Sequence, residues 1–216
     1  MVKIKVCGIT NLEDARAALE AGADALGFNF YARSLRYVVP EDARRIIRQL
    51  PREAFCVGVF VNETDAGAVA SKAQEAGVGA VQLHGDESAE YCAALGEHRV
   101  IKALRAGKDF APEQARRFPA ESILLDAYSP HARGGTGETF DWELARRTRE
   151  LVAQLYLAGG LTPENVAQAI AAVRPFAVDV CSGVESAPGR KDAALVRAFV
   201  AAVRACEKNL DAETPI

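Results

Sequence analysis

The sequence predicts a single-domain α/β fold, a (β/α)8 TIM barrel, from three observations. Eight short apolar runs with strand character alternate with eight helix-like segments along the 216 residues, as in parallel strands joined by helices. A content of 50% hydrophobic and 25% charged residues is typical of one globular domain with a large core. Polar residues end several of the apolar runs, where such a barrel places its functional groups. A doubly wound open sheet is the alternative with the same alternation.

Local sequence signals mark where three of the expected helices begin. Thr10-Asn11-Leu12-Glu13 fits a capping box, and Thr162 before Pro163 predicts a helix that begins at the proline. Asp141 is a third candidate cap. The expected strands cover residues 2–7, 24–30, 55–61, 79–84, 98–104, 122–126, 152–158 and 176–181. The expected helices cover residues 11–21, 41–50, 64–76, 88–95, 112–118, 141–150, 163–173 and 192–206.

A short internal repeat supports a fold built from repeated βα units. Residues 20–26 (EAGADAL) recur in similar form as residues 75–81 (EAGVGAV). Each copy is expected to end a helix at its glycine and then to enter a strand, because glycine is the residue that most readily ends a helix in the left-handed conformation.

Charge, hydropathy and cysteine usage narrow the class of protein. A net charge of −3 gives no reason to expect a nucleic acid or an acidic membrane surface as a partner. No apolar run approaches the ~20 residues of a membrane span, and the first residues are expected to form a strand rather than a signal peptide. The five cysteines fit neither a disulfide framework nor a metal site, which favours reduced thiols in the cytoplasm. We expect one catalytic domain over residues 1–207 and a polar tail over 208–216.

Strand alternation brings polar side chains together at one end of the predicted barrel. Successive side chains of a strand point to opposite faces, so each of four strands has an apolar face and a face that turns polar toward its carboxyl end. Because interleaved helices cover the outside of a barrel, we expect the polar face to line its mouth; a half-solvated sheet is the alternative. On this face the four strands carry Lys5 with Cys7, Gln82 with His84, Leu124 with Asp126, and Asp179 with Cys181.

Cys7 and Asp126 are the candidate acid–base pair. A proton donor and a proton acceptor held across a pocket are sufficient for an isomerase. Cys7 acts as a base only if a neighbour lowers its pKa, and otherwise it is a small buried apolar residue. Asp126 is either a general acid in an apolar neighbourhood or a cap for the turn that follows it.

Glycine-rich loops and two arginines are the candidate binding groups. The segment 134–137 (GGTG) and the loops after the seventh and eighth expected strands carry glycines, and the last two loops form the recurring phosphate site of this barrel. Tight turns without a ligand are the alternative. Arg36, or its neighbour Arg33, could hold a carboxylate with two hydrogen bonds. His84 is given a supporting role.

In this order, the motifs resemble the phosphoribosylanthranilate isomerase family of tryptophan biosynthesis, over nearly the whole chain. They are 5–10 (KVCGIT), 27–30 (GFNF), 34–36 (SLR), 81–85 (VQLHG), 125–126 (LD), 134–137 (GGTG), 140–142 (FDW), 157–161 (LAGGL), 182–185 (SGVE), 188–189 (PG) and 191–192 (KD).

The resemblance implies a (β/α)8 barrel that catalyses an Amadori rearrangement of N-(5-phosphoribosyl)anthranilate without a metal or an organic cofactor. Asp126 matches the general acid on the ribose ring oxygen, and Cys7 matches the base at C2′. Arg36 matches the residue that faces the anthranilate carboxylate, and Asp179 lies near the sugar hydroxyls. Cys181 departs from the serine or other small polar residue more usual there. The phosphate loops match Gly159, Gly160, Ser182 and Gly183, and His84 joins the substrate-binding residues.

Two other functions compete with this interpretation. The histidine-pathway isomerase performs the same rearrangement on another phosphoribosyl amine, but that family has an aspartate where this chain has Cys7. A non-catalytic phosphate-binding barrel is the second alternative, and an intact Cys7 and Asp126 argue against it. The expected partner is a small phosphorylated substrate, and the chain is expected to be a monomer or a homodimer.

Overall fold

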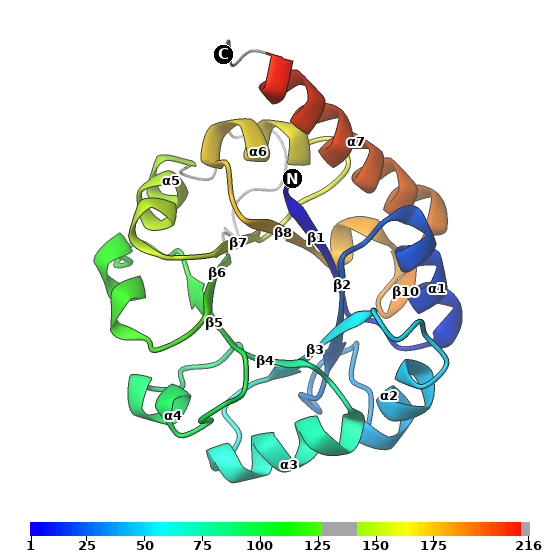
Figure 1. The fold of residues 1–216 in the computed structure, drawn as a ribbon, viewed down its shortest axis with the longest axis vertical. Coiled ribbons are helices and arrows are strands. Elements are labelled where there is room, and N and C mark those ends of the chain that lie inside the picture. Colours follow the sequence, from blue (N-terminus) through cyan, green and yellow to red (C-terminus); the bar gives the residue numbers. More distant parts are fainter. Residues whose placement is uncertain (127–141, 213–216) are drawn as a thin grey trace.

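The computed structural model describes residues 1–126 and 142–212, and they form a closed barrel of eight parallel strands. The strands follow one another around the barrel in sequence order, and helices surround them on the outside (Figure 1). The expected (β/α)8 fold is therefore confirmed, and the doubly wound open sheet is wrong. The last helix packs against both the first helix and the one before it, which closes the outer ring.

The strands and helices agree with the expected order. The barrel strands are β1 (Lys3–Cys7), β2 (Ala25–Asn29), β3 (Phe55–Phe60), β4 (Ala80–Leu83), β5 (Val100–Arg105), β6 (Ser122–Asp126), β7 (Leu155–Ala158) and β8 (Ala177–Val180). The helices are α1 (Leu12–Ala21), α2 (Pro40–Ile47), α3 (Ala66–Ala76), α4 (Ala89–Ala93), α5 (Trp142–Leu151), α6 (Val166–Val173) and α7 (Ala193–Ala212). Two 3-10 helices, η1 (Pro112–Arg117) and η2 (Ser182–Val184), and an antiparallel hairpin of β9 (Glu185–Ala187) and β10 (Arg190–Lys191) complete the chain.

The fifth crossover differs from the expected helix over 112–118, because it is the 3-10 helix η1. Its buried residues, Pro112 and Ala115, are three positions apart, which matches the three residues per turn of a 3-10 helix. Phe118 precedes Pro119, and a residue before proline is pushed out of the helical region. Its backbone is accordingly extended, at φ −97° and ψ 126°, so the helix ends at Arg117.

Two expected helix caps are wrong, and both expected glycine ends are confirmed. Asn11, not Thr10, caps α1 by accepting from the Asp14 N–H, because the Thr10 hydroxyl donates instead to the Gly189 carbonyl at 2.6 Å. Helix α6 begins at Val166 rather than at Pro163. Gly22 and Gly77 end α1 and α3 with φ of 104° and 77°. The cap expected at Asp141 lies outside the described residues.

Side-chain alternation divides the apolar core into two layers, as expected. The larger cluster fills the space between the barrel and its helices, and it contains the residues that flank the polar positions, such as Ile4, Val6, Leu83 and Leu125. A smaller cluster fills the inside of the barrel and includes Leu124. The alternative of a half-solvated sheet is therefore wrong, and the polar positions of the strands face the barrel interior, as expected.

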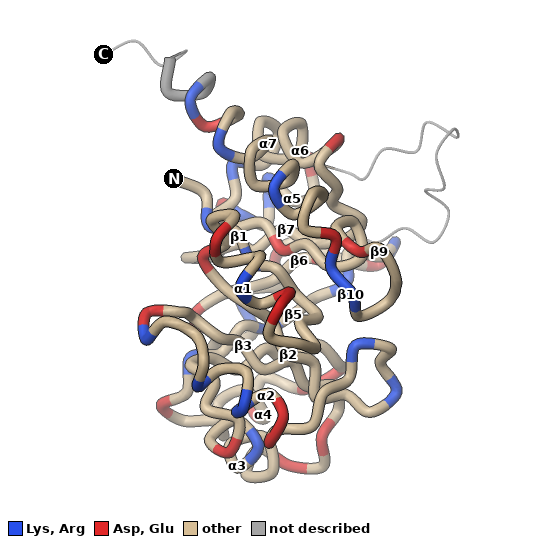
Figure 2. Tube along the Cα trace, turned by 90° about the vertical axis from the view of Figure 1, so that its right-hand side faces the viewer, with Lys and Arg blue, Asp and Glu red and all other residues tan. Residues whose placement is uncertain are grey.

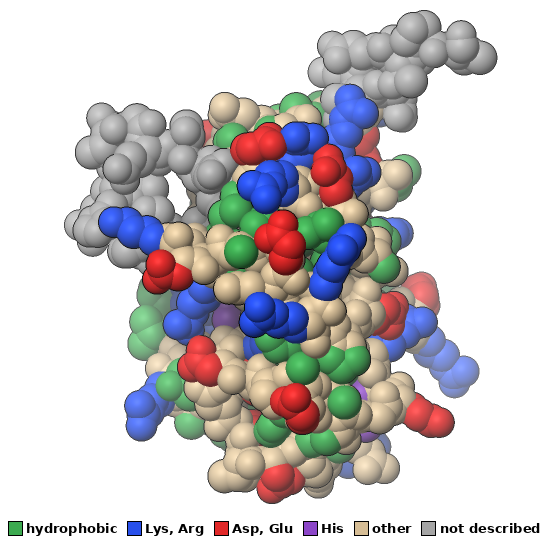
Figure 3. Space-filling model, turned by 90° about the vertical axis from the view of Figure 1, so that its left-hand side faces the viewer, with side chains coloured by type: hydrophobic (Ala, Val, Ile, Leu, Met, Phe, Trp, Pro, Cys, Tyr) green, Lys and Arg blue, Asp and Glu red, His purple; other side chains and the backbone are tan. Residues whose placement is uncertain are grey.

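The surface carries mixed charge. Basic and acidic residues are interspersed along the chain (Figure 2), and they are interspersed also on the face drawn in Figure 3. Helix α7 continues past the expected domain boundary at residue 207 and ends at Ala212, so part of the expected tail is helical. Among the described helices, none combines the length and the apolar character needed to cross a membrane.

Candidate active site

A cavity of about 310 Å³ opens at the carboxyl ends of the barrel strands. Every residue predicted from the sequence to belong to the site lines this cavity: Cys7, Arg36, His84, Asp126, Gly159, Gly160, Asp179, Ser182 and Gly183. The strands that contribute them are far apart in the sequence, and the closed parallel barrel brings their carboxyl ends to one rim. Of the candidate motifs, the loop 134–137 lies outside the described residues.

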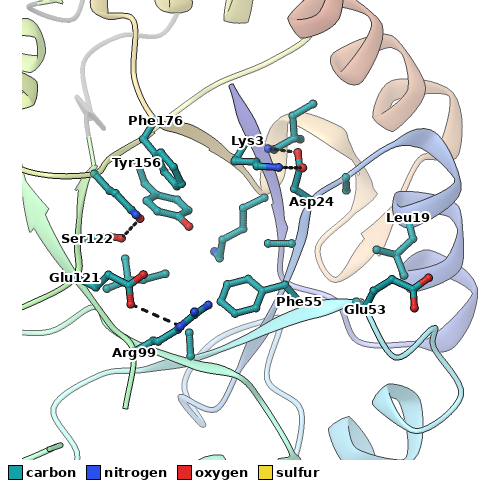
Figure 4. Close-up of a pocket in the computed structure, with 18 of the residues that line it drawn as sticks. Lys3, Leu19, Asp24, Glu53, Phe55, Arg99, Glu121, Ser122, Tyr156 and Phe176 are labelled. Atoms are coloured by element: carbon teal, nitrogen blue, oxygen red, sulfur yellow. Dashed lines mark hydrogen bonds and ion pairs between the residues drawn. The ribbon is translucent and has the colours of Figure 1, made fainter. Parts of the chain in front are cut away.

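The opposite end of the barrel holds a larger cavity of about 750 Å³, shown in Figure 4. Four of its charged side chains form ion pairs, Lys3 with Asp24 at 2.8 Å and Arg99 with Glu121 at 3.8 Å. Aromatic rings of Tyr156 and others form much of the remaining wall. We assign the chemistry to the smaller cavity because perturbed titratable groups converge there, whereas size alone does not identify a site.

A buried ion pair lies beside Cys7. Lys5 Nζ contacts Asp179 Oδ1 at 2.8 Å, and the two side chains are 0% and 7% exposed. The register pairs these residues across β1 and β8. On the other side, Gly27 of β2 leaves the space that these groups fill. A Cβ there would lie 2.7 Å from Cys7 Sγ and 3.1 Å from Lys5 Nζ, so the thiol and the ammonium share one small volume.

Lys5, Cys7 and Asp179 lie close enough to shift one another's pKa. Burial would lower the pKa of Lys5, but the Asp179 carboxylate and the Cys7 sulfur outweigh it and raise that pKa. The same ion pair should lower the pKa of Asp179, yet burial and repulsion by Cys7 raise it to about 7. The presence of Cys7 explains why the pKa values of Lys5 and Asp179 are both raised. The single ammonium of Lys5 faces two acidic groups, the Asp179 carboxyl and the Cys7 thiol, and cannot keep both fully ionised.

The surroundings of the Cys7 thiol favour its ionised form. The Cys181 thiol donates a hydrogen bond to the Cys7 sulfur and lowers its pKa, and the positive charges of Lys5 and Lys191 act in the same direction against burial. Cys181 keeps its proton, because that bond and burial raise its pKa. Cys181 Sγ also lies 4.0 Å from the Glu185 carboxylate, which disfavours a second anion.

Arg36 is oriented by Glu185 of the hairpin strand β9. Its Nε donates to Oε1 at 2.9 Å and its Nη2 donates to Oε2 at 2.6 Å. This double hydrogen bond raises the pKa of Arg36 and fixes the plane of the guanidinium. Lys191 contacts the same carboxylate at 2.8 Å. The remaining edge of the guanidinium is left for an anion at the cavity.

Asp126 belongs to a chain of polar contacts across the end of β4. His84 Nε2 lies 3.3 Å from Asp126 Oδ2, and His84 Nδ1 lies 2.8 Å from Gln82 Nε2. Asp126 is about a quarter exposed. A buried ion pair outside the barrel, Lys102 with Glu87 at 2.7 Å, braces the turn that follows His84, because Glu87 also accepts from the Gly85 N–H.

The last two loops present backbone groups to the cavity. Gly159 and Gly160 have φ of 94° and 67°, a conformation that side chains disfavour. Consecutive backbone N–H groups in such turns form anion-binding concavities. Ser182 and Gly183 begin the short helix η2 across from them. Within the described residues, no group of three His, Cys, Asp or Glu side chains is arranged to hold a metal ion.

Four residues of this site were given no role from the sequence: Lys5, Gln82, Glu185 and Lys191. The sequence did indicate that Lys5 lies near Cys7, because the two residues are two positions apart in one strand and share a face. Gln82 relates to His84 in the same way. Glu185 and Lys191 occur in the motifs quoted above, but their contacts depend on a hairpin that the sequence did not predict.

Comparisons with known proteins identify the family of this chain. The family model described as N-(5'-phosphoribosyl)anthranilate (PRA) isomerase matches residues 4–202. A relative of that name from Trichlorobacter lovleyi is 52% identical over 200 residues, which are 93% of this chain and 97% of that protein.

Two solved structures have the same fold. The phosphoribosyl anthranilate isomerase of Thermotoga maritima has a TM-score of 0.86 and 49% identity, over 95% of this chain and 100% of that one. A second isomerase structure, in complex with reduced 1-(o-carboxyphenylamino)-1-deoxyribulose 5-phosphate, has a TM-score of 0.84 and 46% identity over the same shares of the two chains. This chain therefore belongs to the N-(5'-phosphoribosyl)anthranilate isomerase family.

Proposed function

We propose that this chain converts N-(5'-phosphoribosyl)anthranilate to 1-(2-carboxyphenylamino)-1-deoxyribulose 5-phosphate, the Amadori rearrangement of tryptophan biosynthesis. The observation that carries the proposal is that one cavity holds both a carboxyl group and a thiol whose pKa its neighbours lower. Cys7 and Asp126 lie on β1 and β6, which are not neighbours in the barrel, and both face the cavity. This separation suits two proton transfers at different atoms of one sugar.

Asp126 is the general acid. It gives a proton to the ribose ring oxygen, the bond between that oxygen and C1′ breaks, and the substrate becomes an open-chain Schiff base. His84 contacts the Asp126 carboxyl group and orients it. The charge left on Asp126 after the transfer is accommodated because its side chain is partly exposed to water.

Cys7 is the general base. Its thiolate removes the proton from C2′ of the Schiff base, which gives an enolamine that tautomerises to the ketone. A base must be unprotonated before the reaction, and Lys5 together with the Cys181 thiol maintains that state. Both steps are single proton transfers, so the chain's own side chains can supply them.

The remaining groups bind the two ends of the substrate. Arg36 holds the anthranilate carboxylate with the guanidinium edge that Glu185 does not use. Asp179 accepts from a sugar hydroxyl. Backbone N–H groups bind the phosphate, at the loops that contain Gly159, Gly160, Ser182 and Gly183.

The thiol base also bears on the alternatives. A Cys7 thiolate beside Lys5 is unlike the aspartate of the histidine-pathway isomerase, so no observation favours that function. A reduced thiol is needed for catalysis, which supports the expected cytoplasmic location. The expected monomer or homodimer stays a prediction.

Activity and its loss in two variants test this proposal. Chelator-treated protein should turn over phosphoribosylanthranilate, followed by the loss of substrate fluorescence. Asp126→Asn removes the transferable proton and Cys7→Ser leaves a far weaker base, so each should lower kcat by ~10²–10⁴-fold while substrate still binds. Cys56→Ser is the matched control, because Cys56 is a buried thiol outside the cavity whose pKa burial raises to about 12. No turnover by folded protein contradicts the function, and near-wild-type kcat in either variant contradicts that residue's role.

Substitutions around Arg36 test how the carboxylate is recognised. Arg36→Ala should mainly raise KM, because a charge-assisted hydrogen bond contributes on the order of 1.5–3 kcal/mol. Glu185→Gln should raise KM less, since it loosens the guanidinium without removing it. Arg33→Ala is the control, because Arg33 is exposed and does not line the cavity. If the Arg33 variant shows the higher KM and the Arg36 variant does not, the assignment is wrong.

A further inference from the structure

Gln82 is almost completely buried at the inner face of β4, with 1% of its surface exposed. Its Nε2 lies 2.8 Å from His84 Nδ1. Its Oε1 is buried and accepts no hydrogen bond from any described residue. Leaving a buried carbonyl unpaired costs stability, so the orientation of this amide needs a reason.

The reason lies in what Gln82 imposes on His84. An amide nitrogen can only donate, so His84 Nδ1 must accept and carries no proton. A neutral imidazole then holds its proton on Nε2, the nitrogen 3.3 Å from Asp126 Oδ2. The opposite amide orientation would require a proton on Nδ1 and would turn an unprotonated Nε2 toward Asp126.

We propose that Gln82 is a positioning residue that holds His84 as the Nε2–H tautomer, so that His84 donates a hydrogen bond to the Asp126 carboxylate. This contact stabilises Asp126 after it has given up its proton, and it fixes the direction of the carboxyl group. The proposal deepens the proposed function and rests on Asp126 being the acid.

Nitrogen NMR of histidine-labelled protein tests the tautomer directly, without any assay of activity. His84 should show the Nε2–H tautomer. His98 is an internal reference of the opposite kind, because its Nδ1 lies 2.8 Å from the Leu95 carbonyl and must donate to it. The chain has three histidines. His98→Asn and His131→Asn each remove one set of signals, and the remaining set belongs to His84.

Two variants separate positioning from packing. At a pH where the introduced carboxyl group is ionised, Gln82→Glu offers only acceptor oxygens to Nδ1 and should move the proton of His84 onto that nitrogen. Gln82→Met should leave a mixture of tautomers. Gln82→Met should lower kcat by roughly three- to tenfold, the rate equivalent of one hydrogen bond, with a smaller change in KM. His98 should be unchanged in both.

The proposal is overturned if wild-type His84 carries its proton on Nδ1, or if folded Gln82→Glu keeps the wild-type tautomer at a pH where the introduced carboxyl group is ionised. The wild-type measurement needs no variant to fold. An Nε2–H tautomer in a protein with no isomerase activity would contradict the proposed function and leave the assignment of the tautomer standing.

A different observation concerns the two sulfur atoms at the mouth. Val6 of β1 is paired with Val180 of β8, and Cys7 and Cys181 follow them directly. Neighbouring strands lie about 4.8 Å apart, within the roughly 4.4–6.8 Å that separates the Cα atoms of a disulfide. Both thiols line the cavity.

We infer that Cys7 is a site of oxidation by hydrogen peroxide, with Cys181 as the resolving thiol. The Cys7 thiolate attacks one oxygen of the peroxide and the O–O bond breaks. Hydroxide is the leaving group, and Cys7 becomes a sulfenic acid. The Cys181 sulfur then attacks Cys7 Sγ, the S–O bond breaks, and a disulfide and water form. Two electrons pass from sulfur to peroxide, and a dithiol reverses the change.

Mass spectrometry of peroxide-treated protein tests this inference. The wild type should lose two hydrogens, link the peptides that contain Cys7 and Cys181, and return to its starting mass with dithiothreitol. Cys181→Ser should instead accumulate sulfinic or sulfonic acid at Cys7, which dithiothreitol does not reverse. Each protein is compared with its own untreated sample, and Cys206→Ser should respond as the wild type does. A disulfide that uses another cysteine, or irreversible oxidation of wild-type Cys7, overturns the inference.

Discussion

The active end of this barrel depends on one buried ammonium group. Lys5 has no exposed surface, and a buried charge is costly unless it is paired and hydrogen-bonded. Asp179 supplies the partner, but Cys7 occupies the same volume and competes for the same positive charge. The result is a Cys7 thiol whose pKa is lowered and an Asp179 carboxyl group whose pKa is raised to about 7.

The barrel makes this arrangement possible through its register. Lys5 pairs with Asp179 across β1 and β8, and Gly27 of β2 leaves room for the two side chains on β1. Below them, the inner apolar cluster packs inside the barrel, and Lys5 has no exposed surface. The amino-terminal end has a larger cavity, in which Lys3 pairs with Asp24 and Arg99 pairs with Glu121, so the two ends of one barrel differ in chemistry as well as in size (Figure 4).

Strand periodicity was sufficient to predict much of this site. The fold, the polar faces of four strands and the convergence of Cys7 with Asp126 follow from a period of two and from the parallel order of the strands. Contacts that depend on short or irregular segments could not be predicted. Glu185 reaches Arg36 from a strand of three residues, and Thr10 fails as a cap because a distant carbonyl accepts from its hydroxyl. The tautomer of His84 depends on the orientation of one amide, which no sequence pattern encodes.

The most direct test of this account is a pH titration of thiolate absorbance in the ultraviolet, with wild type, Cys7→Ser, Cys181→Ser and Lys5→Met compared. The account predicts that one thiolate of the wild type forms well below the ordinary thiol pKa of about 8.5. That signal should disappear in Cys7→Ser, persist in Cys181→Ser, and move to higher pH in Lys5→Met. A low-pH thiolate that survives in Cys7→Ser, or a wild-type Cys7 that ionises at the ordinary pKa, would contradict it.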